Sequence, residues 1–235
     1  MDNPIDGSVR RRIHLLRHGE AAYRGADGAA VRDPRLVPLT ARGRTEAQQM
    51  RALLADVSFD FALCSGLPRT RETAALVLQG RDLSLAIEPG LEEVEAGRSF
   101  DLPLAHLAHP FAEAGAAGAR FLGGEAIDAF RARVLEAFER QLAAATWCRA
   151  LFVCHGAVNR VLLGWALGSG VAAWAALEQD SCCLNVLDVD VEPATGKLLR
   201  RLVRAVNVTP YDLAKRNILL TTLEQTAVSV ARQRK

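Results

Sequence analysis

The sequence predicts an α/β fold: a three-layer α/β/α sandwich with a mostly parallel central sheet and a small lid insertion. Apolar runs of strand length alternate with segments of helical periodicity along most of the chain, and this alternation is typical of strands joined by helices. Half of the 235 residues are hydrophobic, enough for one large core. We expect a single domain over residues 1–235, with the insertion at about 99–124 and a C-terminal extension at about 211–235.

In the N-terminal half, each predicted strand is followed by a loop and a helix. The expected strands are 12–16, 59–64 and 83–87, and the expected helices start at Thr40 and Thr70. Thr40 is a typical N-cap residue, and apolar side chains recur at helical spacing after it. Residues 21–38 lack periodicity and contain Gly and Pro, which indicates a long surface loop.

The C-terminal half continues the alternation after the aperiodic insertion. Residues 125–147 have the strongest helical period, and a helix is also expected over 156–167. The expected strands are 150–154, 183–189 and 198–206.

Beyond residue 211, Ile218, Leu219, Leu220 and Leu223 give the chain an apolar face. That face indicates either a helix packed on its own domain or a dimer contact, so a homodimer is a possible assembly.

Composition restricts the partners. Lys and Arg (29) nearly balance Asp and Glu (27), so neither nucleic acid nor a membrane is expected as a partner. No apolar run is long enough to cross a bilayer, and no signal peptide is apparent. The five cysteines include no CxxC pair, which favours reduced thiols in a cytoplasmic protein and gives no support for a metal site.

Chemically useful side chains follow three predicted strands. Arg17 and His18 follow the first strand, Arg69 follows the second by a few residues, and His155 ends the strand at 150–154. In parallel sheets, ligands bind where the carboxyl ends of strands meet loops. Phosphoryl transfer requires cations around the phosphate and a nucleophile in line with the leaving oxygen, and imidazole is one such nucleophile.

Six sequence blocks together resemble those of the histidine phosphatase superfamily, the phosphoglycerate mutase-like proteins. The first block is Leu-Leu-Arg-His-Gly-Glu at 15–20. The others are LTARGRTEA at 39–47, SGLPRTRETA at 65–74, LEEVEAG at 91–97, GGE at 123–125 and FVCHGAVNR at 152–160. The blocks come in the family's order and span about residues 12–207, so the chain is identified as a member of the phosphatase branch.

The resemblance implies roles for five side chains. His18 is the phosphoryl acceptor, and Arg17 and Arg69 clamp phosphate oxygens. His155 is a second phosphate contact. Glu93 protonates the leaving oxygen and then activates water.

Four further residues are candidates for binding phosphate. Gly19 is expected to let the backbone pass close to the phosphate, and N–H groups near Gly156 and Ala157 are expected to donate to it from a helix N-terminus. The family often has Trp-Asn after the signature, with the Asn helping to bind phosphate, whereas this chain has Tyr23-Arg24. Tyr23 keeps an aromatic wall, and Arg24 either adds a cation to the site or points to solvent.

The identity of the acid is less sharply defined, because Glu92 and Glu95 flank Glu93; the spacing from Leu91 and to Gly97 selects Glu93. The preferred function is hydrolysis of a small phosphorylated metabolite without metal or cofactor. The alternatives are a cofactor-dependent phosphoglycerate mutase and a non-catalytic binding protein on the same fold. Arg120 is the only Lys or Arg of the insertion, which favours hydrolysis because a mutase must hold a bisphosphate.

Overall fold

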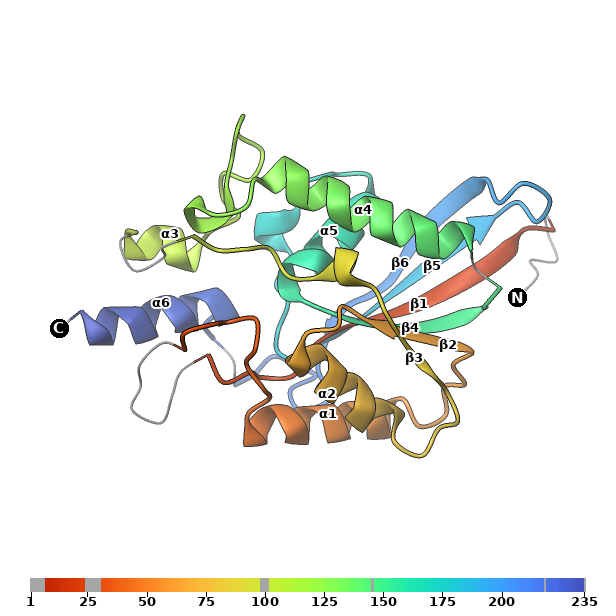
Figure 1. Cartoon of the computed structure of the whole chain (residues 1–235), viewed down its shortest axis with the longest axis horizontal. Coiled ribbons are helices and arrows are strands. Elements are labelled where there is room, and N and C mark those ends of the chain that lie inside the picture. The colour runs from red at the N-terminus through yellow and green to blue at the C-terminus, as the bar shows by residue number, and fades with distance from the viewer. Residues whose placement is uncertain (1–6, 24–30, 98–101, 145, 218, 235) are drawn as a thin grey trace.

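A six-stranded sheet forms the centre of the computed structural model, which describes residues 7–23, 31–97, 102–144, 146–217 and 219–234 (Figure 1). The strands are β1 (Val9–Arg17), β2 (Phe61–Cys64), β3 (Leu85–Ile87), β4 (Arg149–Cys154), β5 (Leu184–Val191) and β6 (Leu198–Val208), in the order β3-β2-β4-β1-β5-β6. The first four strands in that order pair in parallel, whereas β5 is antiparallel to both β1 and β6. The predicted sandwich with a mostly parallel sheet is confirmed.

Helices cover both faces of the sheet (Figure 1). α1 (Ala41–Leu53) and α2 (Pro68–Leu78) lie on one face, and α4 (Ile127–Ala143) and α5 (Gly156–Leu167) lie on the other. The remaining helices are α3 (Leu104–Ala108), α6 (Thr222–Gln233) and the short 3₁₀ segments Pro89–Leu91, Phe121–Gly123 and Trp174–Ala176. Among the residues that the structure describes, no helix is long and apolar enough to cross a membrane.

The helix starts follow local chemistry. The Thr40 hydroxyl accepts from the Gly43 N–H at 3.0 Å, so the predicted N-cap is confirmed. α2 begins at Pro68, two residues before the expected start, because a proline is well suited to the first turn of a helix. The helix expected over 125–147 is shorter than predicted and ends at Ala143.

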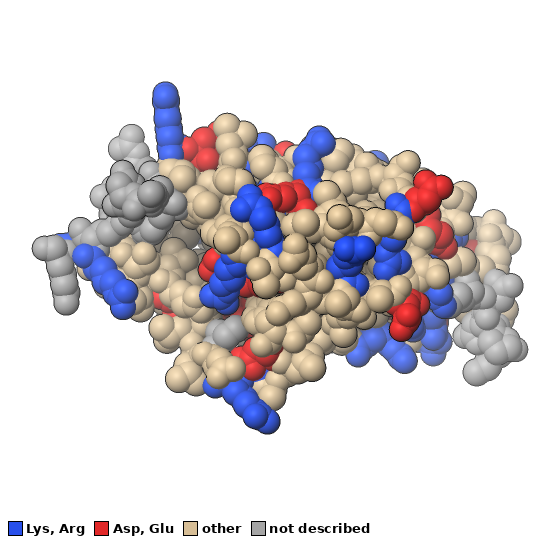
Figure 2. Space-filling view, turned by 90° about the horizontal axis from the view of Figure 1, so that it is seen from below, with Lys and Arg blue, Asp and Glu red and all other residues tan. Residues whose placement is uncertain are grey.

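Central strand β1 contributes to both cores. Ile13 and Leu15 are fully buried among side chains of α4 and α5, whereas Leu16 is buried against α1 and α2. β1 also extends further than its apolar run, because Arg10 and Arg12 form bidentate ion pairs with Asp190 and Asp188 of β5. These pairs continue the strand beyond its predicted start at residue 12. On the face shown in Figure 2, basic and acidic side chains are interspersed.

The C-terminal extension ends in α6, which lies beside α3 from the segment expected as an insertion (Figure 1). Leu107 of α3 packs against Ala227 and Val230 of α6. Of the apolar face predicted at 218–223, Leu223 packs against the main core as predicted. The prediction is wrong for Leu219 and Leu220, which are 90% and 45% exposed, and Ile218 lies outside the described residues. The helix packs on its own chain, and the homodimer stays a prediction. All five cysteines are free thiols.

Candidate active site

The carboxyl ends of three parallel strands bring the predicted residues together. β1 ends at Arg17 and β4 ends at Cys154, so His18 and His155 lie side by side, with ring centroids 5.2 Å apart. The His18 N–H donates to Cys154 O at 3.0 Å, and His18 O accepts from the Cys182 N–H at 3.0 Å. The backbone of His18 is thus fixed by the end of β4 on one side and by the turn before β5 on the other.

The hydrogen bonds of His18 define its protonation. Its Nδ1 lies 2.7 Å from Gly19 O, and a carbonyl oxygen only accepts, so Nδ1 carries the proton. Nε2 therefore holds a lone pair, and it accepts from Arg69 Nε at 3.3 Å. Burial, reinforced by Arg69 and Arg17, lowers the pKa of His18 well below its usual value. The ring is therefore neutral at physiological pH, with a free nitrogen available for attack.

Arg69 is held at the start of α2, beside His18. Its Nη1 donates to Pro34 O at 3.1 Å and to Arg35 O at 3.4 Å. Its Cζ lies 5.6 Å from the centroid of the Tyr23 ring, so the aromatic wall predicted at Tyr23 is next to this arginine. The turn at 33–36 thereby ties the predicted long loop to the site.

His155 is fully buried and joined to a pair of hydroxyl groups. Its Nε2 lies 2.8 Å from Ser65 Oγ, which in turn lies 3.0 Å from Thr70 Oγ1. Its Nδ1 is buried without a hydrogen-bond partner among the described residues. Burial lowers the pKa of His155 well below its usual value, and Arg69 and His18 act in the same direction. An anion at this site would offset both effects.

Arg17 presents one edge of its guanidinium to the site. Both hydrogens of Nη1 are used, by Gln179 O at 2.5 Å and by Thr222 Oγ1 at 3.1 Å. Nε is buried and has no partner in the described chain. Gly156 packs against this edge, since a Cβ there would lie 3.5 Å from Nε. The edge formed by Nε and Nη2 thus remains for an oxyanion.

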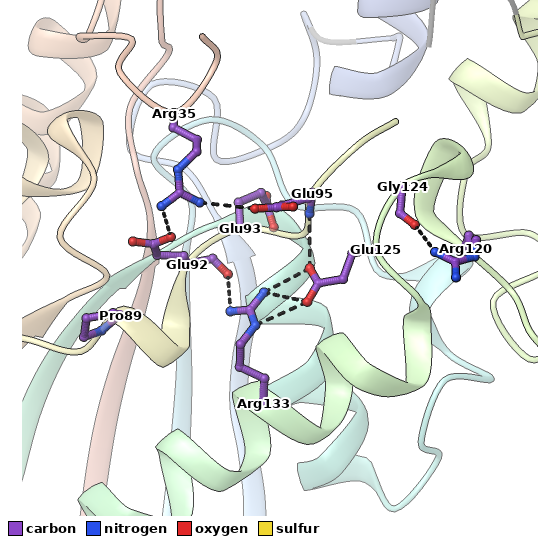
Figure 3. A pocket seen from close by; sticks show the side chains of 9 residues that line it. All are labelled: Arg35, Pro89, Glu92, Glu93, Glu95, Arg120, Gly124, Glu125 and Arg133. Carbon is purple, nitrogen blue, oxygen red and sulfur yellow. Dashed lines mark hydrogen bonds and ion pairs between the residues drawn. The ribbon is translucent and has the colours of Figure 1, made fainter. Parts of the chain in front are cut away.

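Glu93 is distinguished from its acidic neighbours by its contacts. Its carboxylate accepts from the Ala157 N–H at 3.2 and 3.4 Å, at the N-terminus of α5. Glu92 and Glu95 instead form ion pairs with Arg35 on the loop side (Figure 3). The structure therefore places Glu93 against the N-terminus of α5, and the Ala157 N–H expected to bind phosphate is engaged by Glu93.

Gly19 is required for a reason that the sequence did not show. A Cβ at Gly19 would lie 2.5 Å from Gly43 O, so two backbone segments meet here without room for a side chain. The Gly19 N–H also donates to Thr73 Oγ1 at 3.0 Å, which engages it within the protein. Arg24, the possible extra cation, lies outside the described residues.

A polar cleft of about 520 Å³ opens beside Glu93 (Figure 3). Arg133 lies inside it, bound to both carboxylate oxygens of Glu125 at 3.1 and 3.0 Å. Arg120 donates only to Gly124 O there, at 2.7 Å, among the contacts of the described residues. The full lining is Arg35, Pro89, Glu92, Glu93, Glu95, Arg120, Gly124, Glu125 and Arg133.

Sequence reasoning missed three residues of this site. Arg35 lies in an aperiodic loop, and no local pattern indicates its ion pairs. Gln179 contacts Arg17 through its backbone carbonyl, which sequence cannot specify. Thr222 lies 205 positions from Arg17 and outside every recognised block.

Comparison with known proteins gives a consistent result. The family model described as "Histidine phosphatase superfamily (branch 1)" matches residues 13–201. The chain is 35% identical over 198 residues to the adenosylcobalamin/alpha-ribazole phosphatase of Salmonella typhimurium, covering 80% of this chain and 95% of the relative.

Solved structures of phosphatases have a similar fold. A putative alpha-ribazole-5'-P phosphatase from Escherichia coli superposes with a TM-score of 0.65 at 31% identity, over 84% of this chain and 96% of that one. A mycobacterial glucosyl-3-phosphoglycerate phosphatase reaches a TM-score of 0.69 over 84% of this chain and 99% of the other; at 23% identity it shows the fold alone.

Proposed function

Because this chain belongs to the histidine phosphatase superfamily and is a phosphatase, we propose that it hydrolyses the phosphate monoester of a small, hydroxyl-bearing metabolite through a phosphohistidine on His18. Its membership and its phosphatase activity agree with the resemblance found in the sequence.

In the first step, His18 Nε2 attacks phosphorus and the bond from phosphorus to the leaving oxygen breaks. Glu93 gives its proton to that oxygen, so the alcohol leaves neutral. Arg17 and Arg69 stabilise the charge on the transferring phosphoryl group, together with His155. The products are a free alcohol and a phosphohistidine.

In the second step, the Glu93 carboxylate takes a proton from water, and the oxygen attacks phosphorus. The bond between phosphorus and His18 Nε2 breaks, which releases phosphate and restores the neutral imidazole. Glu93 is then protonated, ready for the next ester.

One observation carries this proposal. The hydrogen bond from His18 Nδ1 to Gly19 O, 2.7 Å long, leaves Nε2 unprotonated beside the cation of Arg69. A nucleophile needs that free lone pair, and a transferring phosphoryl group needs that charge.

The cleft beside Glu93 supports a polar alcohol as the leaving group. Seven of its nine lining residues are charged, and the carboxylates of Glu92, Glu95 and Glu125 are paired with Arg35 and Arg133. Charged groups in ion pairs still form hydrogen bonds with hydroxyl groups of a substrate. An apolar substrate body would instead remove water from these groups without replacing its hydrogen bonds, which costs free energy. An uncharged, hydroxylated substrate body therefore suits this cleft better than an apolar one.

Names of relatives supply the first compound to test. The Salmonella relative is an adenosylcobalamin/alpha-ribazole phosphatase, so alpha-ribazole 5'-phosphate heads a screen of sugar and polyol phosphates. The mutase alternative is tested in the same screen with 3-phosphoglycerate and its bisphosphate. Isomerisation without phosphate release would contradict the hydrolase proposal.

The decisive experiment concerns His18. Enzyme incubated with a substrate labelled at phosphorus is quenched in alkali, where phosphohistidine persists, and counted. We expect label on the wild type and none on His18→Ala, with hydrolysis reduced at least about 10³-fold. His106→Ala, an exposed histidine of α3, is the matched control and should behave as wild type. Undiminished hydrolysis by His18→Ala would refute the mechanism.

A further inference from the structure

The C-terminal helix α6 lies outside the family match at 13–201, yet it reaches the phosphate pocket. Thr222, its first residue, accepts a hydrogen bond from Arg17 Nη1 at 3.1 Å. The other described acceptor for Nη1 is Gln179 O, at 2.5 Å. Thr222 therefore supplies one of the two contacts that fix the rotation of the guanidinium plane.

A partly buried ion pair fixes Thr222 in turn. Its N–H donates to Glu178 Oε1 at 3.1 Å, and Glu178 Oε2 pairs with Arg160 Nη2 at 3.1 Å. Arg160 Nη1 donates to Gly156 O at 3.2 Å, and Gly156 packs against Arg17. The start of α6 is thus linked, through Glu178 and Arg160, to the backbone of Gly156 beside Arg17.

The body of α6 is anchored on α3. Ala227 and Val230, both 6% exposed, pack against Leu107, and Arg234 Nη2 donates to Leu102 O at 2.8 Å. A capping box of Thr221 and Glu224 fixes the first turn of α6. Because the helix is continuous from Thr222 to Val230, its docking on α3 and its contact with Arg17 depend on each other.

We propose that α6 is a positioning element of the active site: Thr222 orients Arg17 toward the phosphate, and the packing of α6 on α3 holds Thr222 in place. The proposal rests on the function proposed above, in which Arg17 contacts the phosphoryl group. An arginine that donates through Nε and Nη2 must hold that edge in the plane of the oxyanion. Loss of the Thr222 contact frees the plane to rotate about the remaining bond to Gln179 O.

The first test removes the hydroxyl of Thr222. Thr222→Val keeps the shape of the side chain, Thr222→Ser keeps the hydroxyl, and Thr226→Val changes an exposed threonine one turn along α6. The measured quantities are the Kd of orthovanadate and the separate KM and kcat. We expect Thr222→Val to weaken vanadate about five-fold, the size of one ordinary hydrogen bond, with a matching loss in kcat/KM. Thr222→Ser and Thr226→Val should stay within two-fold of wild type.

The second test loosens the helix. Val230→Asp puts a charge against Leu107, whereas Val228→Asp puts the same charge at a site that is 40% exposed. We expect weaker vanadate binding for Val230→Asp alone. Wild-type affinity in both Thr222→Val and Val230→Asp would overturn the proposal. Failure of the wild type to bind vanadate or to hydrolyse esters would instead contradict the proposed function.

Discussion

Replacing Glu93 by glutamine tests the proton transfer without disturbing the shape of the site. Two N–H groups donate to Glu93 Oε1: Val94 at 3.1 Å and Ala157 at 3.2 Å. A glutamine carbonyl oxygen accepts the same two bonds, so the side chain keeps its position. What it loses is the ability to give a proton to the leaving oxygen and to take one from water.

The magnitude follows from that loss. A positioned general acid or base contributes about 10²- to 10⁴-fold, which corresponds to about 2.7–5.4 kcal/mol in the barrier. The neighbouring carboxylates should contribute much less. Glu95 is exposed, and its ion pair with the half-exposed Arg35 is 3.5 Å long; such pairs stabilise by about 0–1 kcal/mol.

The assay compares two leaving groups. With an alkyl phosphate, kcat/KM of Glu93→Gln should fall about 10²- to 10⁴-fold. With p-nitrophenyl phosphate the loss should be smaller when phosphorylation limits the rate, because nitrophenolate leaves without needing a proton. Glu92→Gln and Glu95→Gln are matched controls, and they should lose less than about five-fold with either substrate.

Two results would refute this reasoning. If Glu95→Gln lost as much kcat/KM as Glu93→Gln, our assignment of the general acid to Glu93 would be wrong. A Glu93→Gln enzyme that turns over alkyl phosphates at the wild-type rate would remove Glu93 from the chemistry.

Three further predictions concern stability and metal. The buried His14 has a pKa lowered to about 4 by desolvation and by Arg12; as pH falls below 6.5 the unfolded chain takes up a proton that the folded chain resists. The free energy of unfolding should therefore fall by up to about 3 kcal/mol between pH 6.5 and 4. In urea titrations, His14→Leu should lack this part of the pH dependence of stability. Gly43→Ala places a Cβ 2.1 Å from Glu20 O, so its melting temperature and kcat/KM should both fall, whereas Gly115→Ala meets only a side chain at 3.6 Å and should change neither. Hydrolysis should persist in EDTA, because the proposed mechanism takes its nucleophile from His18 and its positive charge from Arg17 and Arg69; lost activity restored by a divalent ion would contradict that mechanism.

Local signals predicted most of the fold. Thr40 capped its helix as expected because N-capping depends on one side chain and the turn that follows it. Strand limits were less accurate, since β1 is lengthened by the ion pairs of Arg10 and Arg12 with distant aspartates. No pattern around either arginine indicates a partner on β5.

In the active site, too, the sequence predicted the residues that lie in motifs but not the contacts that depend on the tertiary fold. Residues in motifs, such as His18 and His155, lie together because parallel strands end at one edge of the sheet. The sequence could not show that Ala157 donates to Glu93, because that contact depends on how the loop after β3 folds back onto α5. It also overestimated Leu219, whose apolar character by itself did not place it in a core.

The central place of β1 has a consequence for how the protein folds. In the sheet, Arg12 lies opposite Arg149 of β4 on one side and Asp188 of β5 on the other. The strand that leads directly to the nucleophile therefore has no sheet partner while the first half of the chain is synthesised. Contacts between residues so far apart in sequence form late and slowly. Until they form, the apolar segment Ile13–Leu16 is exposed and can associate with apolar segments of other chains. Chaperone dependence and aggregation during expression should therefore respond most strongly to changes in β1, the same strand on which catalysis depends.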